Sequence, residues 1–178
     1  MKQDIRKLMI ELRKKIDVSS KIVYQETIIN KIKNDINYQH AKSVAIYMPL
    51  AYEIDLRSLC NDDKIFLIPR VDGKHMVFVK YYKDMKYIPS SFGVNEPSKD
   101  EIIYDKKIDF MITPALAISK TLDRIGYGKG YYDQYLSLNR PHHVMGVIYP
   151  FQEIEAFEVS SNDQKIDGYY IGDLWILH

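Results

Sequence analysis

The first 36 residues carry apolar side chains at the spacing of α-helices. The pattern predicts an amphipathic helix over residues 2–16 with an apolar face made of Ile5, Leu8, Met9, Leu12 and Ile16. Its opposite face would carry Arg6, Lys7, Arg13 and Lys14. A second helix is predicted from Ile22, Ile28, Ile29, Ile32 and Ile36. We expect Ser19 or Ser20 to cap it, because a serine hydroxyl accepts a hydrogen bond from a free backbone amide.

Beyond residue 42 the pattern changes to short runs rich in β-branched and aromatic side chains. These runs cover residues 43–48, 64–69, 76–81, 109–113 and 143–149, with a last one at 169–171 or 174–177. Residues 53–60 and 131–138 are predicted to be helices between them. Nearly continuous apolar strands separated by helices favour a parallel sheet that is covered on both faces. We therefore expect an α/β fold, a three-layer sandwich whose largely parallel, mixed central sheet has about six strands flanked by helices.

The segment 82–108 has few apolar runs and contains Pro89, Gly93 and Pro97. It is predicted to be a long loop, and loops of that length are often functional. No linker or repeat divides the sequence, so residues 1–178 are expected to form a single domain.

Composition excludes several classes of protein. The chain is 46% hydrophobic and 28% charged, which is typical of soluble globular domains and excludes a wholly disordered chain. With 25 basic and 24 acidic residues the net charge is +1, so no global field attracts nucleic acid or an anionic membrane. The single cysteine, Cys60, is expected to pack as a small apolar residue. With neither a signal-like start nor an apolar run of membrane-spanning length, we expect a cytoplasmic protein.

Three of the eight glycines lie within five residues, at Gly126, Gly128 and Gly130. Alternating glycines permit positive φ, so successive N–H groups can converge on one anion at the start of the next helix. Arg124 and Lys129 flank this loop and could neutralise phosphoryl oxygens, and Asp133 could hold a bridging divalent cation. The spacing matches neither Walker A nor the dinucleotide fingerprint. Spacing alone leaves open a solvated, glycine-rich surface turn.

The wider context of this loop is residues 113–136, TPALAISKTLDRIGYGKGYYDQYL, which resembles the signature of the 5-formyltetrahydrofolate cyclo-ligase family. Further similar blocks occur in order at residues 2–6, 53–55, 68–70, 93–97 and 163–167. Two positions depart from the family pattern. Ile118-Ser119 stands where the family usually has Phe-Asp, and Asn162 stands where it often has His. Roles built on that aspartate or that imidazole cannot be transferred to this chain.

The resemblance implies an ATP-dependent reaction in which 5-formyltetrahydrofolate becomes 5,10-methenyltetrahydrofolate, with Arg124 and Lys129 as catalytic residues. It also implies a Mg²⁺ cofactor held by Asp133 and Asp167. By match to the family, ATP would bind Lys2, Gln3, Asp4, Ile5, Arg6, Arg124, Ile125, Gly126, Tyr127, Gly128, Lys129, Gly130, Tyr131 and Tyr132. The folate substrate would bind Glu53, Tyr127, Gly128, Lys129, Gly130, Tyr131 and Tyr132.

The expected partners are therefore two small molecules, 5-formyltetrahydrofolate and ATP, with no nucleic acid and no membrane, and the expected state is a monomer. One alternative is a non-catalytic nucleotide- or RNA-binding module that uses the glycine loop and the Lys- and Tyr-containing stretch 80–86. The nearly neutral charge weighs against RNA. Another alternative is a sugar-phosphate enzyme on a similar scaffold, which leaves Asp133 and Asp167 unexplained.

Overall fold

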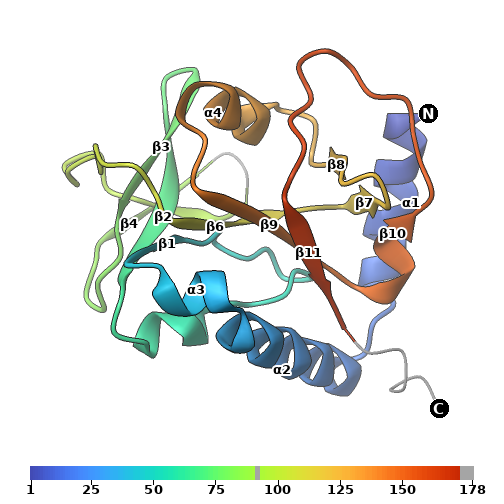
Figure 1. Cartoon of the computed structure of the whole chain (residues 1–178), viewed down its shortest axis with the longest axis horizontal. Coiled ribbons are helices and arrows are strands. Elements are labelled where there is room, and N and C mark those ends of the chain that lie inside the picture. The colour runs from blue at the N-terminus through green and yellow to red at the C-terminus, as the bar shows by residue number, and fades with distance from the viewer. Residues whose placement is uncertain (91–92, 173–178) are drawn as a thin grey trace.

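A six-stranded sheet forms the centre of the fold (Figure 1). The computed structural model describes residues 1–90 and 93–172. The strand order is β11-β9-β6-β1-β2-β3, and all neighbours are parallel except the β2–β3 hairpin. This sheet consists of β1 (Ser43–Ala45), β2 (Ile65–Asp72), β3 (His75–Lys80), β6 (Phe110–Pro114), β9 (His143–Ile148) and β11 (Gly168–Ile171). The predicted mixed, largely parallel sheet is confirmed.

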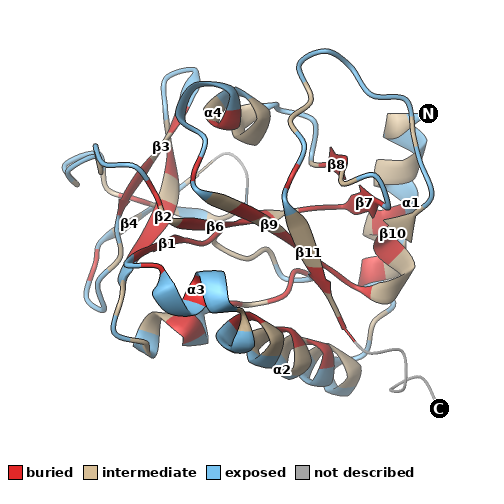
Figure 2. Ribbon diagram, in the orientation of Figure 1, coloured by how far each residue is buried: buried red, intermediate tan, exposed pale blue. Residues whose placement is uncertain are grey.

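Helices cover both faces of this sheet. One face packs against α2 (Val18–Asn34), α3 (Ile36–His40) and η1 (Arg57–Asn61), and the other packs against α4 (Tyr131–Asn139). Side chains alternate between the two layers, so Val44 and Ile46 join the α2 side while Ala45 joins the α4 side. Figure 2 shows the sheet buried between helices whose outer surfaces are exposed. The predicted three-layer arrangement is therefore confirmed.

The first helix, α1 (Lys2–Lys14), packs beside a second, three-stranded sheet. That sheet contains β7 (Ala117–Ser119), β8 (Arg124–Ile125) and β10 (Glu153–Ile154), which follows the short helix η2 (Pro150–Gln152). Such short strands carry too little periodicity to be predicted. Helix α1 is confirmed, but the assignment of its faces is wrong at two positions: Arg13 is buried and Leu8 is 55% exposed. Arg13 lies one turn after the buried Met9, so the two share a helix face.

The second helix begins and ends differently from its prediction. Its cap is Asp17 instead of a serine, because the Asp17 carboxylate accepts a hydrogen bond from the Ser20 amide at 2.9 Å. The Ser19 hydroxyl also donates to this carboxylate, so the serine hydroxyls serve the cap as donors. The helix ends at Asn34, and Asp35 caps α3 by accepting from the Asn37 amide. Side-chain caps therefore fix both helix starts.

The predicted helix over 53–60 is wrong, since only η1 forms within that region. Glu53 and Asp55 instead accept hydrogen bonds from nearby backbone amides, those of Leu50 at 2.8 Å and Arg57 at 3.0 Å. Such local side-chain acceptors compete with helical hydrogen bonds.

The segment 82–108 is not wholly irregular. It contains the hairpin of β4 (Tyr87–Pro89) and β5 (Asn95–Pro97), and Ile103 forms an isolated bridge to Val79. Of the two expected positions for the last strand, residues 169–171 lie in β11, whereas 174–177 lie outside the described residues. Within the described ranges, no helix is long and apolar enough to cross a membrane.

Candidate functional site

A cavity of about 370 Å³ opens at the carboxyl ends of the central strands. Tyr47 and Met48, which follow β1, line it together with Pro114 at the end of β6. From β1 the sheet extends to β2 and β3 on one side, and to β6, β9 and β11 on the other. The strand order therefore changes direction at β1, and such a point leaves a crevice outside the strand ends. Ligand sites of open α/β sheets usually lie there.

The glycine loop, residues 126–130 between β8 and α4, forms one wall of the cavity. Gly128 and Gly130 have φ values of +95° and +73°, which confirms positive φ at two of the three glycines. Gly126 has no positive φ, but a Cβ there would lie 2.6 Å from Nη1 of Arg124, so any larger residue would displace that guanidinium. Gly130 is the N-cap of α4, so the positive end of that helix begins at the cavity wall.

Two arginines far apart in sequence meet at this loop. Arg124 is 5% exposed, and its guanidinium donates to the Pro114 carbonyl at 3.1 Å and to Asp133 at 3.2 Å. Arg6 on α1 donates through Nε to the Gly126 carbonyl at 2.8 Å. Because both guanidinium groups are held by backbone carbonyls, their positive charges are fixed at the glycine loop before any ligand binds.

Lys2 also lines the cavity, where its amine pairs with Asp163. Burial alone would raise the pKa of Asp163, but hydrogen bonds from Lys2 and the Ser160 amide lower it. Asp163 therefore stays ionised beside the lysine. The wall formed by α1 and the glycine loop thus carries the basic residues Lys2, Arg6, Arg124 and Lys129.

The structure does not bring Gln3, Asp4 and Ile5 to the cavity, in contrast to the expected ATP-binding run 2–6. Residues four apart share one helix face, so Lys2 and Arg6 point together while the intervening side chains point elsewhere. Asp4 pairs with the chain's amino group at 3.2 Å, and Ile5 packs in the cluster of Met9 and β7.

Glu53 lines the cavity and is 3% exposed. Its carboxylate accepts hydrogen bonds from the Tyr127 hydroxyl at 2.8 Å and the Leu50 amide at 2.8 Å. Burial and the Glu53 charge raise the pKa of Tyr127, against the opposing effect of Arg13. Tyr127 therefore stays protonated and acts as a donor. The remaining lone pairs of Glu53 are available to a ligand with N–H donors.

The expected aromatic residues Tyr131 and Tyr132 line the same cavity. The Tyr132 ring lies 5.4 Å from Cζ of Arg124, a cation–π contact that holds both groups. The structure thus gathers Glu53, Tyr131 and Tyr132 next to the basic wall, although they come from two distant parts of the sequence.

The two expected metal ligands are placed differently. Asp133 lines the cavity beside Arg124, whereas Asp167 is absent from its wall and accepts from Arg140 and the Val144 amide, each at 2.7 Å. No group of three or more potential ligands is found among residues 1–90 and 93–172. A single carboxylate still fits Mg²⁺ bound to a nucleotide, because Mg²⁺ takes its other ligands from phosphates and water. The metal role of Asp167 stays a prediction.

Besides Asp163, the sequence interpretation missed two charged residues of the wall, Arg70 and Glu96. Arg70 is 4% exposed and donates to the Ser98 and Glu101 carbonyls, at 2.7 and 3.2 Å. Glu96 accepts from the Val71 amide at 3.3 Å. These bonds hold residues 96–101 against β2, so part of the predicted loop 82–108 lines the cavity. Both residues lie in blocks that marked the family resemblance, but spacing indicated no role for them.

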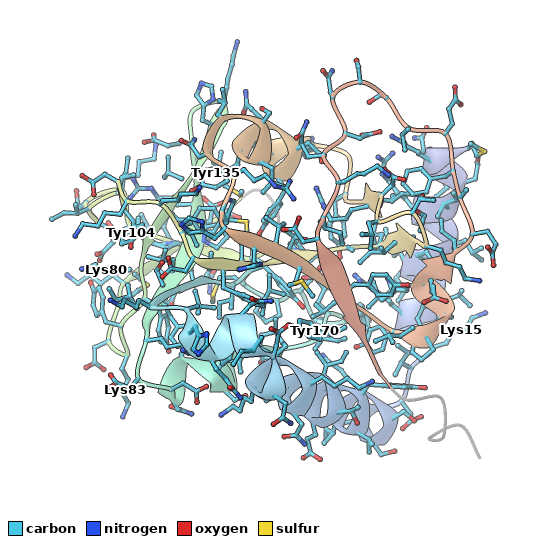
Figure 3. The ribbon with its side chains drawn as sticks, in the orientation of Figure 1. Lys15, Lys80, Lys83, Tyr104, Tyr135 and Tyr170 are labelled. Carbon is cyan, nitrogen blue, oxygen red and sulfur yellow. The ribbon has the colours of Figure 1, made fainter. Side chains whose placement is uncertain are left out.

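The stretch 80–86, considered above for RNA binding, does not contribute to the cavity wall. Figure 3 shows Lys80, the last residue of β3, and Lys83 at the left edge of the molecule, and both side chains are exposed. Cys60 packs against the core, where burial raises the pKa of its thiol to about 12. It therefore behaves as the predicted packed residue and not as a nucleophile.

Comparisons with known proteins agree with this fold. The model of the 5-formyltetrahydrofolate cyclo-ligase family matches residues 1–170. A 5-formyltetrahydrofolate cyclo-ligase of Mus musculus is 26% identical, over 94% of this chain and 87% of its own. One of Mycoplasma genitalium is 30% identical, over 86% and 88%. The solved structure of Aquifex aeolicus 5,10-methenyltetrahydrofolate synthetase is similar with a TM-score of 0.84 and 26% identity, covering 96% of this chain and 89% of that one.

Proposed function

Because the chain belongs to the 5-formyltetrahydrofolate cyclo-ligase family, we propose that it converts 5-formyltetrahydrofolate to 5,10-methenyltetrahydrofolate, with ATP and Mg²⁺, releasing ADP and phosphate. One observation supports this most: a single cavity joins a basic glycine-loop wall, suited to phosphates, to the buried carboxylate of Glu53. Neither the basic wall nor Glu53 alone would distinguish an ATP-binding module from a folate enzyme.

In this proposal the formyl oxygen attacks the γ-phosphorus of ATP, and ADP leaves. N10 of the folate then attacks the formyl carbon and loses its proton, while the C–O bond breaks and phosphate departs. No covalent enzyme intermediate is needed, which suits a cavity of backbone amides and cations. The protein's contribution is positioning and neutralisation of charge on the phosphoryl oxygens.

Two walls of the cavity have separate roles in this proposal. The phosphate wall is the basic wall of α1 and the glycine loop, and the folate wall carries Glu53, Tyr131 and Tyr132. Lys2, Arg6, Arg124 and Lys129, with the amides of the glycine loop, bind the phosphates. Glu53 accepts hydrogen bonds from the amino and N–H groups of the pterin, and Tyr131 and Tyr132 pack on the folate. Asp133 would hold Mg²⁺, which supplies neutralisation of phosphate charge when bound.

The direct test is the near-ultraviolet absorbance of the methenyl product with formylfolate, ATP and Mg²⁺. We expect product only when ATP and a divalent ion are both present, because the formyl oxygen is a poor leaving group until it is phosphorylated. Equal turnover without ATP would exclude this function. Salt-dependent RNA affinity without any turnover would instead support the non-catalytic alternative.

For Lys2→Ala we expect the KM for ATP to rise about tenfold or more, while the KM for formylfolate and the melting temperature change little. A charge-assisted hydrogen bond to phosphate has this magnitude, at about 1.5–3 kcal/mol. Steady-state kinetics with each substrate varied in turn measure the effect. Lys7→Ala is the matched control, because Lys7 is exposed on the same helix and outside the cavity. Unchanged ATP kinetics in Lys2→Ala would restrict α1 to a packing role.

For Glu53→Gln we expect formylfolate binding to weaken by about 1–3 kcal/mol, because the amide keeps the shape but loses the charge and one acceptor. ATP affinity should stay within about twofold, since the change lies outside the phosphate wall. Isothermal titration with each ligand separates the two effects. Equal losses for both ligands would indicate a folding defect and contradict the assignment of Glu53 to the folate.

A further inference from the structure

We propose that Arg13, which does not line the cavity, is a positioning residue that holds Glu53 and Tyr127 in place for the folate. The inference rests on the proposed function, since it names what orients the folate-binding carboxylate. Arg13 lies near the end of α1, seven residues beyond the phosphate-facing Arg6. The sequence pattern placed it on a solvated face, but only 5% of it is exposed.

One guanidinium nitrogen of Arg13 faces the site. Nη1 donates to the Tyr127 hydroxyl at 2.9 Å, and that hydroxyl donates to Oε1 of Glu53 at 2.8 Å. The same Nη1 lies 3.6 Å from Oε1 itself, so the positive charge also faces the carboxylate directly. The Glu53 side chain is 4% exposed. Burying a carboxylate is costly unless it is paired and hydrogen-bonded, so Arg13 and Tyr127 stabilise Glu53 in this position.

The other terminal nitrogen of Arg13 faces the protein. Nη2 donates to the Ala115 carbonyl and to Oε1 of Gln152 at 3.3 Å. Gln152 is fully buried, and its own amide donates to the Leu116 carbonyl at 2.6 Å. The planar guanidinium therefore connects the backbone before β7 to the Tyr127–Glu53 pair, which a single amine could not do.

This placement means that the two ends of α1 serve different parts of the site. The first turns of the helix carry Lys2 and Arg6 to the phosphate wall, and the last turn carries Arg13 beneath the folate wall. Figure 1 shows α1 as one straight helix beside β7 and β8, so a single rigid element contributes to both walls. Arg13 acts through Glu53 and Tyr127 and touches no substrate.

The test compares Arg13→Met, Arg13→Lys and Glu53→Gln with the double variant Arg13→Met/Glu53→Gln, by titration with formylfolate and with ATP. Arg13→Met should weaken formylfolate binding about tenfold or more, the effect of losing a hydrogen-bonded charge, with ATP affinity within about twofold. Arg13→Lys should recover part of the loss. In the Glu53→Gln background, Arg13→Met should lower formylfolate affinity by less than about twofold, because the carboxylate that Arg13 positions is already gone.

Three results would overturn the inference. The first is wild-type formylfolate affinity in Arg13→Met, and the second is an equal loss of both ligands. The third is the same fold-loss with and without Glu53→Gln. If Arg13→Met does not fold, Arg13→Lys carries the same comparison, with the melting temperature as a check. Lys14→Met is the matched control, because Lys14 is the next residue of α1 and is exposed. Failure of the wild-type protein to bind formylfolate would instead remove the proposed function itself.

Discussion

Gly128→Val should abolish measurable ATP binding, raising the dissociation constant about 100-fold or more, while the protein still folds. Two effects add. Gly128 has a φ of +95°, which a β-branched residue adopts only with a strain of about 1–3 kcal/mol. A Cβ at this position would also lie 3.3 Å from Cζ of Arg6, so two further methyl groups would displace the arginine and block the approach of phosphate to the backbone.

Gly73→Val is the matched control for this experiment. Gly73 also has a positive φ, of +62°, but it lies in the β2–β3 turn, where a Cβ would have open space around it among the described residues. We expect a similar loss of stability, about 1–2 kcal/mol, with an unchanged ATP dissociation constant. Isothermal titration and thermal melts on both variants separate strain from binding. An unchanged ATP dissociation constant in Gly128→Val would show that the glycine loop is only a turn.

Asp133→Asn should lower kcat about 100-fold or more while the protein still folds. The asparagine oxygen can still accept from Arg124 and from the Gln164 amide, both 3.2 Å from the present Oδ1, so the local fold is kept. What is lost is the negative charge that would hold Mg²⁺ against the transferring phosphoryl group. The measurement is kcat as a function of Mg²⁺ concentration.

The variants Asp84→Asn and Asp167→Asn complete the comparison. Asp84 is exposed and outside the cavity, so its amide variant should behave as wild type. Asp167→Asn should reduce kcat less than Asp133→Asn does, because Asp167 pairs with Arg140 and is absent from the cavity wall. Wild-type kcat for Asp133→Asn at limiting Mg²⁺ would remove Asp133 from the metal site.

Removing one of the two buried charges, Arg13 or Glu53, should destabilise the protein more than removing an exposed charge. Arg13 and Glu53 are each at least 95% buried, so removing one charge leaves the other without compensation. We expect Arg13→Met or Glu53→Gln alone to lower the free energy of unfolding more than Lys14→Met does, by about 3 kcal/mol in the extreme case. The double variant should be no less stable than the worse single one. Urea unfolding of the four variants measures this.

Local features of the sequence were enough for much of the architecture. Helical spacing of apolar residues predicted α1, because the 3.6-residue period follows directly from which face of a helix is buried. Short runs of β-branched and aromatic residues predicted the six strands of the sheet, and the helix expected over 131–138 between two of them is α4. The glycine spacing predicted positive φ where Gly128 and Gly130 show it, since that conformation is a property of the residue itself. The ordered family blocks predicted most of the cavity-lining residues around that loop.

Contacts between distant segments determined what the sequence pattern could not. An arginine in a helical pattern is usually solvated, and nothing in the pattern marks Arg13 as buried. Its burial becomes favourable only because Tyr127 and Glu53 lie against it in the folded chain. Likewise, Lys2 and Arg6 reach the cavity while Gln3 and Ile5 do not, because the docking of α1 on β7 selects one helix face. A residue's own preferences fix the local backbone, whereas the burial of a charge depends on partners that only the folded chain brings within a few ångströms.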